Sequence, residues 1–139
     1  MRAAVIKGFT LVELIVTLSV GSILLAVAVP GYQTFVQNNR LTTQNNSFVS
    51  ALMLAKSEAV NRSSWVTVCP STSGTGCTGG TTWSGGWLIF ADANNDKAVN
   101  AGEVIIKVNA AMVGGNTLTS GNPAITFSGT GFSQGSNGT

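Results

Sequence analysis

The pattern of apolar residues divides the chain into a helical first part and a strand-rich remainder. Residues 9–29 contain a single charged side chain, Glu13. A helix of that length is about 31 Å long, enough to cross a bilayer. After Pro30 and Gly31, apolar side chains recur mostly every three or four residues to about residue 61, as in an amphipathic helix: Tyr32, Phe35, Val36, Phe48, Leu52, Ala55 and Ala59. The pattern predicts one long helix, kinked at Pro30 and weakened by the polar stretch 37–46.

Short runs rich in Val, Ile, Trp and Phe follow the helix, each bounded by turn residues. They cover residues 64–69, 86–91, 103–108 and 124–127. Strands that are few and closely spaced indicate a small antiparallel sheet packed on one face of the helix, an α+β fold. The tryptophans, Trp65, Trp83 and Trp87, are expected to fill and cover its core. Residues 109–139 carry no charge and contain one of these strands, and the last seven suggest disorder or the loss of a further strand.

Composition narrows the class of function. Of the 139 residues, 44% are hydrophobic and only 9% are charged, the formal net charge is +2, and there is no histidine. Lack of histidine excludes Ser-His and Cys-His catalysis and most zinc sites. The serines have no visible base, so we expect a protein that is not an enzyme.

Charges around the apolar run predict its orientation. Arg2 and Lys7 precede the run, and the next basic residue, Arg40, lies well beyond it. The positive-inside rule then places the N-terminus in the cytoplasm and the remainder outside. No small-residue processing site follows Val29, so the helix is expected to be retained.

Two cysteines, Cys69 and Cys77, lie on the predicted exported side. An even number of cysteines in an oxidising compartment favours a disulfide, here one that closes a small loop. The alternatives are two unpaired buried thiols or, less favoured because histidine is absent, a metal site.

Glu13 is costly inside an apolar helix and requires a partner or access to the interface. If the chain is cut after Gly8, the new amino group of Phe9 lies about one helical turn away from Glu13. That amine would compensate the carboxylate within one chain or between neighbouring subunits. The simpler alternative is a glutamate that reaches the membrane interface.

The segment around this glutamate resembles the processing site of type IV prepilins and type II secretion pseudopilins. It reads KGFTLVEL, residues 7–14. The resemblance implies cleavage between Gly8 and Phe9 by a prepilin peptidase, N-methylation of Phe9, and assembly roles for Glu13 and Pro30. It also implies a cleaved leader over 1–8, a transmembrane and assembly helix over 9–30, and a periplasmic pilin-like domain over 31–139, anchored in the inner membrane.

The exported part is similar to the GspH/FimT family of minor pilins and pseudopilins. The similarity rests on VTVCPSTSGTGC, residues 66–77, and GGWLIFADANNDKAVNAGEVII, residues 85–106. It implies a type IV pilin-like fold and a low-abundance subunit that primes or caps a type IV pilus or type II secretion pseudopilus, with other pilins as partners. The cysteine pair resembles the pilus branch more closely than the secretion branch.

The alternative function is DNA binding for natural transformation. Some family members carry a basic Gly-Arg-x-Arg tail associated with DNA capture, whereas this chain has no arginine after Arg62. The exported basic residues do not cluster along the sequence: Arg40, Lys56, Arg62, Lys97 and Lys107. Few phosphates are neutralised by such a set, so DNA affinity is expected to be weak and sensitive to salt.

An acidic segment over 92–103 spaces its oxygen ligands as an EF-hand calcium loop does. The candidate ligands, at loop positions 1, 3, 5, 9 and 12, are Asp92, Asn94, Asp96, Asn100 and Glu103. Ala98 can offer its carbonyl at position 7, but Lys97 replaces the glycine of position 6. The flanks also read as strands, so the competing interpretation is an exposed hairpin loop. Calcium is the one cofactor that the sequence suggests.

Overall fold

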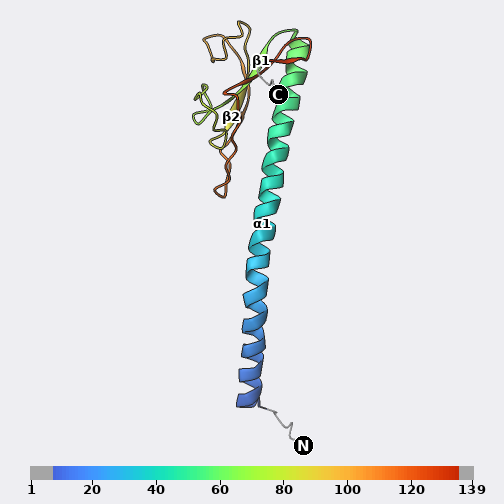
Figure 1. Cartoon of the computed structure of the whole chain (residues 1–139), viewed down its shortest axis with the longest axis vertical. Coiled ribbons are helices and arrows are strands. Elements are labelled where there is room, and N and C mark those ends of the chain that lie inside the picture. The colour runs from blue at the N-terminus through green and yellow to red at the C-terminus, as the bar shows by residue number, and fades with distance from the viewer. Residues whose placement is uncertain (1–7, 135–139) are drawn as a thin grey trace, which may run out of the picture. The chain divides into compact units, whose positions relative to one another are not determined.

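The computed structural model describes residues 8–134 and divides the chain into two compact units, 1–39 and 40–139. One helix, α1 (Leu11–Arg62), runs through both units. The strands all lie in the second unit: β1 (Val66–Pro70), β2 (Trp87–Ala91), β3 (Ile105–Asn109), β4 (Ile125–Phe127) and β5 (Ser133–Gln134). Figure 1 shows β1 and β2 with the second half of α1. The predicted long helix and the small antiparallel sheet are therefore confirmed.

Local chemistry defines both ends of α1. Thr10 caps the first turn, where its hydroxyl accepts a hydrogen bond of 3.2 Å from the backbone N–H of Glu13. The helix ends at Arg62 because Ser63 adopts a left-handed φ of 50°, which turns the chain toward β1. Glu13 in the first turn and Arg62 in the last turn both complement the helix dipole.

The polar stretch 37–46, which the sequence suggested would weaken the helix, is continuous helix. Tertiary hydrogen bonds compensate for its having Leu41 as its one apolar residue. Gln44 donates from Nε2 to the carbonyl of Val113 at 2.9 Å and accepts from Asn116 Nδ2 at 2.7 Å. Pro30 also lies inside the helix, and Thr34 Oγ1 donates to its carbonyl at 3.1 Å.

The first unit exposes nearly all of its apolar side chains. Within the described residues α1 is the one helix long and apolar enough to cross a membrane. Its large hydrophobic residues from Leu11 to Val29 are all exposed, because nothing else in the described chain covers them. Burial of this surface therefore requires a lipid environment or other protein chains.

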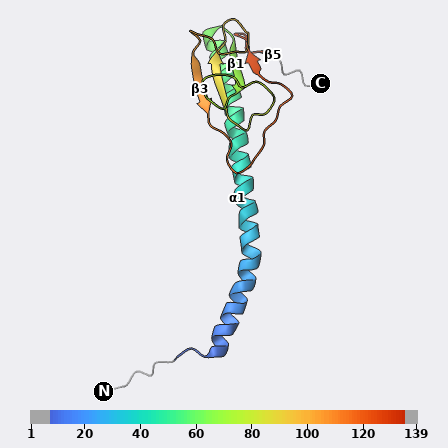
Figure 2. The ribbon, with the colours of Figure 1, turned by 90° about the vertical axis from the view of Figure 1, so that its left-hand side faces the viewer.

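The second unit contains a five-stranded antiparallel sheet in the order β3-β2-β1-β4-β5. Figure 2 shows β3 and β5 at its two edges. Four strands match the four predicted runs, and every strand end lies within two residues of its predicted position. The fifth strand, β5, was not predicted, because Ser133 and Gln134 have no apolar alternation and are recognised only by their pairing with β4. These two residues belong to the last seven, for which the sequence suggested disorder, so that expectation is wrong for them. Residues 135–139 lie outside the described chain.

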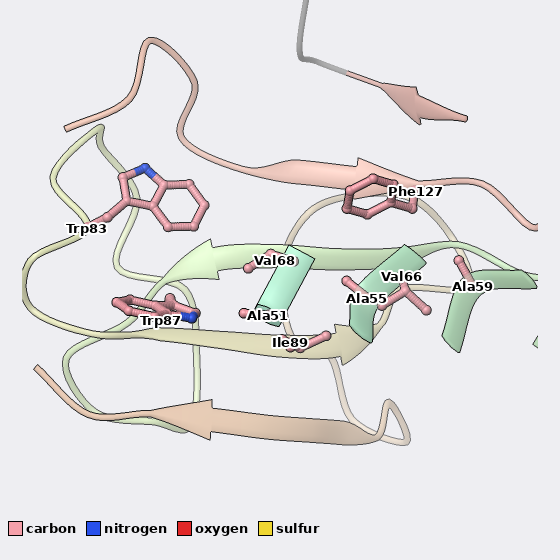
Figure 3. Packing of buried hydrophobic residues seen from close by; sticks show 9 residues of the cluster. All are labelled: Ala51, Ala55, Ala59, Val66, Val68, Trp83, Trp87, Ile89 and Phe127. Carbon is pink, nitrogen blue, oxygen red and sulfur yellow. The ribbon is translucent and has the colours of Figure 1, made fainter. Parts of the chain in front are cut away.

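The core lies between the sheet and one face of α1. Three alanines, Ala51, Ala55 and Ala59, are buried at intervals of four residues and let the helix backbone approach the strands closely. Figure 3 shows them against Val66, Val68, Trp83, Trp87, Ile89 and Phe127. The burial of Trp83 and Trp87 confirms their predicted place, and Trp65 is half-buried.

Phe48 extends this core along the helix. Its ring packs edge-on against Trp83 and Trp87, with centroid distances of 5.3 and 5.4 Å. A smaller apolar cluster covers the opposite face of the sheet: Cys69, Leu88, Phe90 and Ala124, with Cys77, Val99 and Ile105 packed against it. Because both faces are covered, β1 and β2 are buried almost throughout.

The alanine contact predicts sensitivity to side-chain size. Ala55→Leu should lower the free energy of unfolding by about 1–3 kcal/mol, because extra methylenes force the helix away from the sheet. Chemical denaturation of the full chain in detergent measures this. Met53→Leu is the matched control, since Met53 is 67% exposed and its replacement should change stability by less than about 0.5 kcal/mol. Equal stability of Ala55→Leu and the wild type would contradict close packing.

Candidate functional site

The predicted processing and assembly residues lie at the start of α1. Gly8 and Phe9 precede the helix, and Phe9 is 83% exposed. The predicted leader lies outside the described residues except for Gly8. Glu13 occupies the first turn of α1 and has no ion-pair partner among residues 8–134. An exposed carboxylate with an apolar surface on every side is available to a partner outside the chain.

Pro30 marks the other end of the apolar stretch. It lies 17 residues after Glu13, which corresponds to about 26 Å along a helix. This distance approaches the thickness of a bilayer's hydrocarbon core. Glu13 and Pro30 therefore lie near opposite ends of the apolar surface.

The predicted disulfide is confirmed. Cys69 and Cys77 are joined, with Cα atoms 5.6 Å apart, and the described part of the chain holds no free cysteine. The interpretations as unpaired thiols or a metal site are therefore wrong. Ser71 supports the small loop by donating from Oγ to the carbonyl of Gly76 at 2.6 Å. The bridge fixes the loop that follows β1.

The buried side chain of Asp92 anchors the acidic loop, residues 92–103, to the sheet. Its side chain is fully buried and accepts hydrogen bonds from Thr67 Oγ1 at 2.6 Å and from the backbone N–H groups of Asp96 and Lys97 at 3.1 Å each. Thr67 is in turn hydrogen-bonded to Thr126 at 2.8 Å. This buried network joins the loop to β1 and β4. The roles of Thr67 and Thr126 were not predictable from the sequence, because their hydrogen-bond partners are distant along the chain.

Hydrogen bonds within the loop also occupy the other candidate ligands. Asp96 accepts from the N–H of Ala98 at 2.9 Å and from the amides of Asn100 and Asn94 at 2.6 and 2.8 Å. The bond from Ala98, followed by that from Asn100, lowers the pKa of Asp96 below its ordinary value of 3.8. Its contribution to stability is therefore present above the unfolded-state pKa and is lost as pH falls through the lower folded-state value.

Two features bear on the EF-hand resemblance of this loop. Glu103 accepts a hydrogen bond of 2.9 Å from the N–H of Asn100. Lys97, at the position where the calcium motif has glycine, adopts a left-handed φ of 63°, so the backbone makes the sharp turn without glycine. In the described part of the chain, no group of three or more Asp, Glu, Cys or His side chains is placed to hold a metal.

The fold and the helix define a class of protein. An apolar N-terminal helix that continues onto a small antiparallel sheet is the type IV pilin-like architecture. The family model for the prokaryotic N-terminal methylation motif matches residues 5–29, and the model described as type II transport protein GspH matches residues 44–139. The chain belongs to the GspH family of pilins and pseudopilins, which are structural and non-enzymatic subunits. No solved structure matches the chain.

The buried carboxylate predicts a selective loss of stability. Asp92→Asn should lower the free energy of unfolding by about 1.5–3 kcal/mol. The reason is that the NH₂ group of asparagine would face a backbone N–H whose hydrogen bond the carboxylate now accepts. Denaturant unfolding of the full chain in detergent measures the change. Asp96→Asn is the matched control in the exposed part of the loop, and its effect should be clearly smaller. A smaller loss for Asp92→Asn than for Asp96→Asn would contradict the anchoring role.

Calcium binding by the loop stays a prediction from the spacing of its oxygens. Binding requires Asp92 and Asp96 to exchange their bonds to backbone amides for bonds to the ion. Isothermal titration of the full chain should then give saturable heat below about 1 mM calcium, and Asp96→Asn should abolish it. Absence of heat from the wild type over this range would reject the site.

Proposed function

We propose that this chain is a low-abundance subunit that primes or caps a type IV pilus or type II secretion pseudopilus. The observation that carries the proposal is the uncovered apolar surface of α1 from Leu11 to Val29, with one carboxylate, Glu13, in its first turn. Such a surface suits a helix that is stored in the inner membrane and then packs against the helices of other subunits. The small residues Gly21 and Ser22 favour close approach of a second helix.

Processing by a prepilin peptidase would create the partner that Glu13 lacks. Cleavage between Gly8 and Phe9 gives the chain a new α-amine directly before α1, and the peptidase then methylates this amine. The exposure of Phe9 and its position before the first turn support access by the peptidase. In a filament the amine of one subunit would meet the Glu13 carboxylate of its neighbour and so define the axial register. A charge pair in apolar surroundings is strong only when both members are present.

The disulfide supports the proposed topology. The link between Cys69 and Cys77 persists in oxidising compartments and is rare in the cytoplasm. It therefore favours a periplasmic second unit and a cytoplasmic N-terminus before cleavage. The match to the methylation motif supports membrane anchoring by the same helix.

Structural assembly is favoured over DNA uptake. Beyond the apolar stretch, the described chain carries five basic side chains: Arg40, Lys56, Arg62, Lys97 and Lys107. Arg62 is already paired with Glu58 at 2.8 Å. Of the remaining four, Arg40 and Lys56 lie 16 residues apart on α1, Lys107 lies on β3 and Lys97 lies in the acidic loop. Four cations can neutralise few phosphates, whereas DNA binding gains affinity from many.

Replacement of Glu13 tests the proposed assembly role. Glu13→Ala should leave membrane insertion intact and lower recovery in sheared filaments at least about tenfold, since loss of one member of a buried charge pair costs several kcal/mol. Immunoblotting of membrane and filament fractions measures both quantities.

Glu58→Ala is the matched control on the same helix. It removes a half-buried carboxylate already paired with Arg62, outside the apolar stretch, so insertion and incorporation should both stay near the wild-type level. Unchanged recovery of Glu13→Ala in filaments would refute the role of Glu13.

A further inference from the structure

A pocket of about 200 Å³ lies in the second unit between α1 and the β2–β3 edge of the sheet. Gln44 and Ser47 line it from the helix, Trp87 and Asn109 from the strands, and residues 110–113 from the segment after β3. Trp87 and Asn109 are register partners in the β2–β3 pair, so their side chains share one face of the sheet. Trp87 belongs to the core on the helix-facing side (Figure 3).

Two of the residues that line this pocket carry a buried donor with no acceptor within the described chain. They are Trp87 Nε1 and Asn109 Nδ2, and Trp87 is only 2% exposed. An indole N–H and a carboxamide NH₂ can only donate hydrogen bonds. A buried donor without an acceptor is destabilising, and such groups are rare in native proteins. The pocket therefore suits an occupant that brings acceptor oxygens.

The charges around the pocket favour an anionic acceptor. Lys107 lies two residues before Asn109 on β3, which places it on the same face of the strand. The Arg40 guanidinium lies beside the adjoining loop, since a Cβ atom on Gly114 would be 3.2 Å from its Nη1. Segments 40–57 and 104–134 contain no acidic residue. No carboxylate of these segments is present to compete for the donors.

The walls of the pocket are held by hydrogen bonds before anything binds. Gln44 donates to the carbonyl of Val113 at 2.9 Å, and the N–H of Met112 donates to the carbonyl of Ser84 at 2.8 Å. Gly86, with a φ of +107°, lets the carbonyl of Asn109 approach to 2.7 Å of where a Cβ would stand. A preformed site loses little conformational entropy on binding.

We propose that this pocket receives the carboxylate of an aspartate or glutamate side chain from a neighbouring filament subunit. Val113, which is 65% exposed, lines the pocket in the segment after β3. An apolar surface around buried donors is typical of a protein–protein contact. A polyanionic partner such as DNA or a lipid surface would need more cations than Arg40 and Lys107. The inference rests on membership of a filament-forming family and is independent of a priming or capping position.

Acetate is a direct probe of the binding chemistry. With the full chain in detergent micelles and its tryptophans labelled with ¹⁵N, the Trp87 indole N–H resonance should shift saturably with acetate at about millimolar concentrations. Trp87→Phe assigns the resonance. Sodium chloride at equal ionic strength and neutral acetamide are the controls, and neither should reproduce the full shift. The Trp65 resonance should stay unchanged.

Asn109 offers a second variant at a half-buried edge position. Asn109→Leu removes the donor and should weaken acetate binding at least about tenfold. Asn109→Asp places a like charge at the site, so it should abolish acetate binding and lower incorporation into filaments further than Asn109→Leu does. Thr75→Asp, which adds the same charge to an exposed loop, is the matched control and should leave both readouts unchanged.

The outcomes separate the possible occupants. No shift of Trp87 beyond that caused by chloride would mean that the pocket holds water only and would overturn the proposal. Acetate binding combined with normal incorporation of Asn109→Asp would overturn the neighbouring subunit as the source of the carboxylate. The acetate titration uses the unassembled chain, so it does not depend on whether Glu13→Ala is incorporated into filaments. Failure of the pocket proposal can therefore be distinguished from failure of the assembly proposal.

Discussion

A single 52-residue helix must bury apolar surface in two different environments, and the rest of the structure depends on this constraint. From residue 48 onward one face of α1 is buried within its own chain, since its alanines lie against the sheet and Phe48 packs against two tryptophans. From Leu11 to Val29 nothing in the described chain covers it. The free energy available from burying that surface is therefore released only outside the chain, in lipid or between helices. In such surroundings a carboxylate such as that of Glu13 is stable when it is paired with a positively charged group.

The buried polar groups of the second unit follow a consistent logic. Asp92 is buried but accepts three hydrogen bonds, and Gln44, which is half-buried, is paired at both ends of its carboxamide. Each of these groups ties a loop to the sheet or to the helix. In the described chain, three buried side-chain atoms lack a partner: the acceptor Asn95 Oδ1 and the donors Trp87 Nε1 and Asn109 Nδ2, of which the two donors belong to residues that line one pocket. Unpaired buried polar groups are rare in native proteins, and they indicate a role other than stabilising the fold.

The features that depend on residues close together in the sequence were predictable. Hydrophobic spacing located α1 and four strands, and the paired cysteines predicted their own disulfide. Features that depend on contacts distant in sequence were not predictable: the two-residue β5, the continuity of the helix through 37–46, and the threonines that serve Asp92. The spacing of oxygens over 92–103 matches a calcium loop, yet the same side chains act as acceptors for the loop's own amides. Sequence spacing alone does not distinguish these two uses.

The central claim is that α1 is a processed assembly helix, and the N-terminus of the mature protein tests it most directly. Mass spectrometry of the N-terminal peptide, from protein purified from membranes of the native host, identifies the first residue and its modification. Processing as proposed gives a chain that begins with N-methylated Phe9 and lacks residues 1–8. A chain that retains Met1, or one cleaved after the apolar helix, would contradict the claim.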